Sequence, residues 1–199
     1  MFRQLASRPV GIMDCLLAAV QGSGNFLALY RTEGAGAHIS VEQILGNSFA
    51  YGTVAGVASL FLMAAILGRL GARAGGKSTT TQVVHVLAYG GVPLVAAVVL
   101  WVLTALVAGE SAFVAIPRPD AEPFVVLLLG VQFAAYVLLL LWSILLQVMG
   151  FSEIQGLAVR KAFGVWILAQ LVGYLASLFL AMLIEALFPG ALLHLIPQH

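Results

Sequence analysis

The chain has 199 residues, of which 62% are hydrophobic and 9% are charged, and its formal net charge is +1. Soluble domains carry about 25% charged residues, so this chain has too few charges to solvate a globular surface. The composition therefore excludes a soluble enzyme, a disordered chain and a nucleic-acid-binding protein. Because Cys15 is the single cysteine, an internal disulfide and a multi-cysteine metal site are also excluded.

The first long apolar stretch, residues 10–30, is interrupted by polar side chains. On a helical wheel of about 100° per residue, Asp14, Gln21 and Asn25 fall within about 40° of one another. A narrow polar stripe on an otherwise apolar helix is typical of a membrane span that faces a bundle. Two alternatives remain open: an interfacial or re-entrant helix, and a cleaved signal peptide, since two arginines precede the stretch.

Four further stretches are apolar over a length that crosses a bilayer. A span needs about 20 such residues, because a helix rises 1.5 Å per residue across a hydrocarbon core of about 30 Å. Backbone polar groups in lipid must be satisfied within the segment, which makes each stretch a helix. The sequence thus predicts an all-α, polytopic transmembrane bundle that forms one domain over 1–199. Its five spans are expected at about 10–30, 49–67, 83–108, 124–149 and 162–188.

The basic residues predict the orientation of this bundle. Lys and Arg are in excess on cytoplasmic loops of membrane proteins. Five spans with the N-terminus inside and the C-terminus outside place seven of the nine basic residues in the cytoplasm. With only four spans, five basic residues would lie on one side of the membrane and four on the other. The charge pattern therefore favours five spans.

Polar and small side chains recur on one face of each expected span. Lipid tails cannot solvate them, so we expect these faces to meet inside the bundle. The spacing of Gly52 and Gly56 is a close-packing pattern, and Pro93 predicts a kink in its helix. The stripes have two readings: helix packing, or the lining of a polar path or pocket. The candidate interior residues are Asp14, Gln21, His85, Gln132, Tyr136, Gln147, Gln170, Tyr174 and Glu185.

No catalytic set, cofactor site or metal site follows from these residues. Asp14 and Glu185 are expected near opposite membrane surfaces, and His85 has no carboxylate at helical spacing. We therefore expect His85 to be an interfacial histidine near the cytoplasmic boundary rather than a ligand or a proton relay. The sequence predicts a protein that is not an enzyme.

Residues 71–78 read GARAGGKS, which fits the phosphate-binding loop pattern G-x-x-x-x-G-K-[ST]. That chemistry needs a buried strand before the loop and an acidic residue nearby for Mg²⁺, whereas here a membrane helix precedes it. We do not expect nucleotide binding. Arg69, Arg73 and Lys77 instead predict a basic loop that contacts anionic lipid.

Two segments combine glycine turns with basic and aromatic residues. One is GGKSTTTQVVHVLAYGGVP, residues 75–93, and the other is WSILLQVMGFSEIQGLAVRKAFGV, residues 142–165. Both segments resemble the Yip domain family of multipass membrane proteins. The resemblance implies five spans and, for a compact chain of the bacterial type, a location in the inner membrane. The residues that carry it are Gly75, Gly76, Lys77, Tyr89, Pro93, Trp142, Gly150, Glu153, Gly156 and Lys161.

The glycines of these segments are expected to form two cytoplasmic turns, at Gly75 and Gly76 and again at Gly150 and Gly156. The turns are either simple connections or a partner-binding surface. With the resemblance, they indicate a scaffold or adaptor in membrane organisation, whose partners are the lipid bilayer and other membrane proteins or a second copy. The alternative is a small permease or a lipid-handling protein with a polar interior.

Overall fold

The computed structural model describes residues 8–114 and 122–187, without the side chains at positions 177, 180, 181, 184, 185 and 187. Over these ranges the regular structure is entirely helical, and five helices are long and apolar enough to cross a membrane. The predicted fold class is thereby confirmed. The long helices are α2 (Ile12–Thr32), α3 (Val41–Arg73), α4 (Thr80–Gly90) continued by α5 (Val92–Ala108), α6 (Pro123–Gln155) and α7 (Val159–Leu187).

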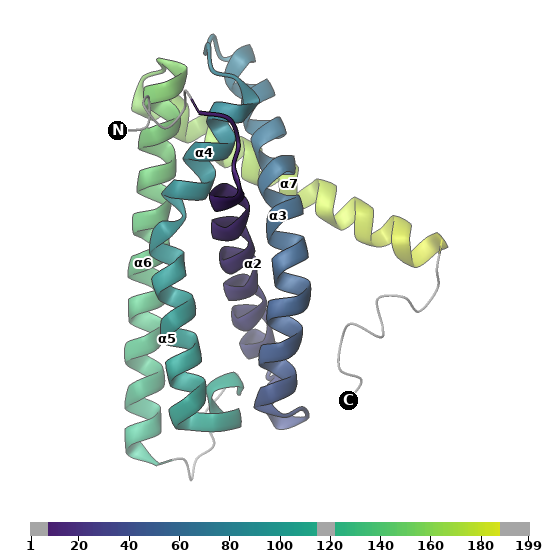
Figure 1. Ribbon diagram of the computed structural model, residues 1–199, viewed down its shortest axis with the longest axis vertical. Coiled ribbons are helices and arrows are strands. Elements are labelled where there is room, and N and C mark those ends of the chain that lie inside the picture. Colours follow the sequence, from purple (N-terminus) through teal and green to yellow (C-terminus); the bar gives the residue numbers. More distant parts are fainter. Residues whose placement is uncertain (1–7, 115–121, 188–199) are drawn as a thin grey trace.

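Helices α2 to α6 stand side by side as an upright bundle, with α2 between α3 and the α4–α5 rod (Figure 1). Two short 3₁₀ helices, η1 (Ala35–Ala37) and η2 (Gly109–Phe113), lie against each other at one end. At a rise of 1.5 Å per residue, the 33-residue helix α3 is about 50 Å long. It therefore extends beyond a hydrocarbon core of about 30 Å.

The closest contact between helices joins α2 to α3. A Cβ atom added to Gly22 would collide with the backbone of Gly52 and Gly56, and one added to Gly56 would collide with the Ala18 carbonyl. Glycine at these positions lets the two backbones touch, which compensates for the absence of a hydrophobic driving force inside lipid. The close packing predicted from the spacing of Gly52 and Gly56 is confirmed.

The third span is broken between α4 and α5. Gly91 separates the two helices, and Pro93 stands in the first turn of α5, where its missing N–H is tolerated. Proline cannot donate to the carbonyl four residues earlier, so the hydrogen-bond ladder is interrupted here. The kink predicted at Pro93 is confirmed.

Two turns lie together at one end of the bundle: residues 74–79 between α3 and α4, and residues 156–158 between α6 and α7. We call this end the basic end, because Lys77 and Lys161 are exposed there. Ser78, in the turn between α3 and α4, donates its backbone N–H to Gln155 Oε1 at the end of α6, at 3.1 Å. Gly75 (φ +89°) and Gly156 (φ +67°) adopt left-handed backbone conformations that favour glycine. Gly150, expected to form a turn, is instead inside α6, because that helix continues to Gln155.

The last helix leaves the bundle. Helix α7 packs against α3 and α6, and Gly173 lies directly against the sulfur of Met63 on α3. Beyond this crossing, α7 runs obliquely past the side of the other helices (Figure 1). The sequence predicted a fifth span at about 162–188, and α7 covers Val159–Leu187, but its oblique course could not be read from the sequence.

Candidate functional site

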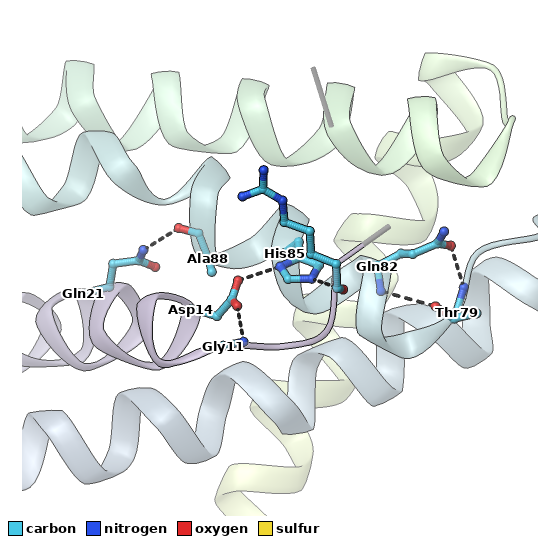
Figure 2. A network of polar contacts seen from close by, with 8 residues as sticks. Gly11, Asp14, Gln21, Thr79, Gln82, His85 and Ala88 are labelled. Atoms are coloured by element: carbon cyan, nitrogen blue, oxygen red, sulfur yellow. Dashed lines mark hydrogen bonds and ion pairs between the residues drawn. The ribbon is translucent and has the colours of Figure 1, made fainter. Parts of the chain in front are cut away.

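A buried ion pair joins the first turn of α2 to α4. Asp14 Oδ1 lies 2.7 Å from His85 Nδ1, and the two residues are only 2% and 3% exposed. The second carboxylate oxygen of Asp14 accepts the backbone N–H of Gly11 at 2.8 Å. His85 Nε2 lies 2.9 Å from the Arg8 carbonyl. Figure 2 shows His85 reaching across from α4 to the start of α2.

The hydrogen-bond partners fix the charge of this pair. A main-chain carbonyl can only accept, so His85 Nε2 must donate to Arg8. A single hydrogen remains between Nδ1 and the Asp14 carboxyl. Whether it resides on nitrogen or on oxygen, the pair as a whole carries no net charge. Such a neutral unit is the form in which two ionisable groups are tolerated inside a protein that lies in lipid.

The structure gives His85 a partner that the sequence did not reveal. His85 lies five residues beyond Thr80, about 7.5 Å along α4, and its side chain is buried between helices. The expectation considered carboxylates one helical turn away and missed Asp14, which comes from another helix. The Nε2 atom that a catalytic histidine would offer to a substrate is bonded to the Arg8 carbonyl.

Gln21 bridges α2 to the break between α4 and α5. Its Nε2 donates to the Ala88 carbonyl at 2.9 Å (Figure 2). Its side-chain amide also fills the space beside Gly91, where any Cβ atom would collide with it. The amide thus satisfies a carbonyl at the point where the helical ladder is interrupted.

A cavity of about 180 Å³ opens beside Gln21, and six helices line it. Its apolar walls include Leu87 of α4, Leu94 of α5 and Met63 of α3. None of the lining residues is charged or titratable. The polar side chains around it are all neutral: Gln21, Asn25, Ser59, Gln147 and Gln170.

Three of these polar side chains have no hydrogen-bond partner within residues 8–114 and 122–187. They are Asn25 on α2, Ser59 on α3 and Gln170 on α7, and each is exposed at the mouth of the cavity. Ser59 stands near the middle of the apolar stretch 49–67 and of helix α3. The cavity therefore opens sideways, with unpartnered polar groups at its mouth.

Gln147 forms the fixed inner side of the cavity. Its Oε1 accepts from Trp166 Nε1 at 3.2 Å, and its Nε2 donates to Ser143 Oγ at 3.2 Å. A Cβ atom on Gly90 would press on Gln147, so α4 approaches α6 closely at this point. This network holds α7 and α4 against α6.

The remaining candidate interior residues do not join the cavity. Gln132 is buried at 4% exposure, but neither of its amide atoms has a partner in the described parts of the chain. Tyr136 is half-buried on α6. Tyr174 was expected inside but is 63% exposed, because α7 turns this face away from the bundle. The side chain of Glu185 lies outside the described residues.

Sequence reasoning missed Gln155, which fastens the two turns of the basic end. This residue is 2% exposed, and its side chain fills the space that Gly71 and Gly76 leave open. The loop that matches the phosphate-binding pattern therefore encloses Gln155 and uses the Ser78 amide internally. No sequence pattern singled out Gln155, because it follows the expected span.

The other residues singled out in segments 75–93 and 142–165 lie at the basic end, beside His85 or on the outer surface. Lys77 and Lys161 are exposed at the basic end, and Glu153 is half-buried in the last turns of α6. Tyr89 lies beside His85, with 6.4 Å between the ring centroids. Trp142 faces outward on an apolar groove between α5 and α6.

Within the ranges that the structure describes, no three His, Cys, Asp or Glu side chains gather as a metal site would require. Comparison of the chain with models of known protein families, with curated proteins and with solved structures finds no match in any of the three.

Proposed function

We propose that this chain is a non-enzymatic integral membrane protein that binds the polar end of a membrane-embedded amphiphile, as a lipid-handling protein or small permease does. The observation that carries the proposal is the set of unpartnered side chains at the mouth of the cavity: Asn25, Ser59 and Gln170. A polar group without a partner costs several kcal/mol in hydrocarbon, on the order given by transfer experiments. An amphiphile whose polar end enters the cavity removes this cost.

The ion pair supports a non-enzymatic role. Both nitrogens of His85 are engaged, one by Asp14 and the other by the Arg8 carbonyl. The pair therefore links α4 to the first turn of α2 and to the segment that precedes it, an arrangement we call the His85 clasp. The inner membrane of a bacterium is the proposed location, supported by the basic residues and the resemblance to compact Yip-domain proteins.

The test is the lipid content of the purified protein. We expect the full chain, extracted in a mild detergent, to retain an amphiphile that a triple variant loses, with Asn25, Ser59 and Gln170 each replaced by Leu. Thr53→Leu is the matched control, because Thr53 is exposed on α3 but does not line the cavity. Identical lipid profiles for the triple variant and the unchanged chain would refute the proposal.

A scaffold or adaptor of the Yip type is the second candidate function. It is favoured by α7, which carries Tyr174 on its outward face and runs past the bundle (Figure 1). A polar aromatic side chain on an outward face suits a contact with another helix. If α7 is such a surface, Tyr174→Leu weakens a dimer or the capture of a membrane partner in gentle detergent. A wild-type chain that runs as a monomer without partners would exclude this function.

A further inference from the structure

The chemistry of the cavity identifies the class of its ligand, an inference that rests on the proposed function. We propose that the cavity takes an uncharged, hydroxylated polar end, such as the glycerol moiety of a diacylglycerol, and discriminates against phosphate-bearing headgroups. The observation is that the lining combines amides and a hydroxyl with no charged or titratable side chain.

The neutral side chains at the mouth offer both donors and acceptors. Asn25 and Gln170 each present a carbonyl oxygen and an NH₂ group, and Ser59 presents a hydroxyl. A hydroxyl group of a ligand can donate to one of these residues and accept from another. The acceptor Gln21 Oε1 adds to this set, because the hydrogen bond to Ala88 uses only the Gln21 NH₂ group.

No charged side chain lines the cavity, so none is placed to contact a phosphate there. Arg31 is six residues beyond Asn25 on α2, about 9 Å along the helix axis, and its guanidinium lies over the Trp101 ring. Arg69 is ten residues beyond Ser59 on α3, about 15 Å along the axis. The neutral Asp14–His85 pair offers no net positive charge either. An anionic group in the cavity would lose its hydration without gaining a counter-charge, which is costly in a low-dielectric medium.

The size and the opening of the cavity fit a small polar end with chains left outside. A cavity of about 180 Å³ has room for a group of glycerol size. Asn25, Ser59 and Gln170 are exposed on three different helices, so the mouth faces the surrounding lipid. The acyl chains can then remain in the bilayer while the polar end enters sideways.

The experiment compares lipids that share their acyl chains and differ only in the polar end. The full chain, stripped of lipid in detergent, is titrated with diacylglycerol, phosphatidylglycerol and phosphatidylcholine, and bound lipid is counted by native mass spectrometry. We expect diacylglycerol to bind at least tenfold more tightly than either phospholipid. Asn25→Leu and Gln170→Leu should each weaken diacylglycerol binding at least fivefold, whereas Thr53→Leu should leave it unchanged.

The outcomes separate the ligand class from the proposed function. Tighter binding of a phospholipid that depends on Asn25 and Gln170 would overturn the neutral ligand class and leave the cavity as a lipid site. Binding of no lipid, or binding that none of the variants changes, would overturn both. A dimer that Asn25→Leu dissolves would overturn the lipid as occupant, because a second copy would then fill the mouth. Folding of each variant is checked by its thermal unfolding, which should stay near that of Thr53→Leu.

Discussion

Asp14 Oδ1 and His85 Nδ1 lie 2.7 Å apart, although 71 residues of chain separate them. Removing one partner of such a buried pair costs about 3–5 kcal/mol, because the other is left uncompensated. We expect Asp14→Ala and His85→Ala each to lower the free energy of unfolding by that order. The measurement is unfolding of the purified protein in mixed micelles.

Replacing both members of the pair removes the two buried ionisable groups together. The double variant Asp14→Leu/His85→Leu should lose less stability than the two single replacements together, since no unpaired ionisable group remains. Glu33→Ala, at an exposed acid just after α2, is the control and should change stability by about 0.5 kcal/mol or less. Single variants as stable as Glu33→Ala would contradict a buried pair.

The close approach of α2 and α3 makes Gly22 intolerant of any side chain. Gly22→Ala forces the added Cβ atom into the backbone of α3, and overpacking of this kind costs about 1–3 kcal/mol. Gly130→Ala on α6 is the matched control, because nothing lies within 4 Å of a Cβ atom there. Thermal unfolding in detergent should separate the two variants, and equal midpoints would be inconsistent with the α2–α3 contact.

Two glutamines on α6 should respond in opposite ways to the same substitution. Gln132 is buried without a partner in the described ranges, so Gln132→Leu should leave stability unchanged or raise it. Gln147→Leu breaks the hydrogen bonds to Ser143 and Trp166 and should cost about 1–3 kcal/mol. Chemical unfolding of both variants checks this contrast, and a greater loss for Gln132→Leu would show that Gln132 has a partner.

The hydrogen bond between Ser78 and Gln155 joins the two turns of the basic end, so both turns should lie on the same side of a membrane. In a Cys15→Ser background, Lys77→Cys and Lys161→Cys should be labelled by an impermeant thiol reagent from the same face of sealed vesicles. Glu33→Cys, at the far end of α2, should be labelled from the opposite face. The positive-inside rule further predicts that the lysine face is cytoplasmic. Labelling of the two lysine positions from different faces would contradict the link between Ser78 and Gln155.

Local features of this fold were accessible from sequence, and long-range ones were not. The spacing of Gly52 and Gly56 predicted a close helix contact, and Pro93 predicted a kink, because each acts through the backbone of its own helix. The partner of His85 could not be found this way, since it depends on how α2 and α4 are placed side by side. The outward direction of Tyr174 likewise follows from the oblique course of α7, which no periodicity encodes.

The break between α4 and α5 divides one wall of the cavity into two rigid pieces. Leu87 belongs to the piece that the His85 clasp holds, and Leu94 belongs to the piece beyond Gly91. Because Pro93 has no N–H, the connection through Gly91 relies on two backbone bonds, from Gly91 to the Leu87 carbonyl and from Leu94 to the Gly91 carbonyl. The two halves of this wall are therefore joined by fewer hydrogen bonds than a continuous helix would provide.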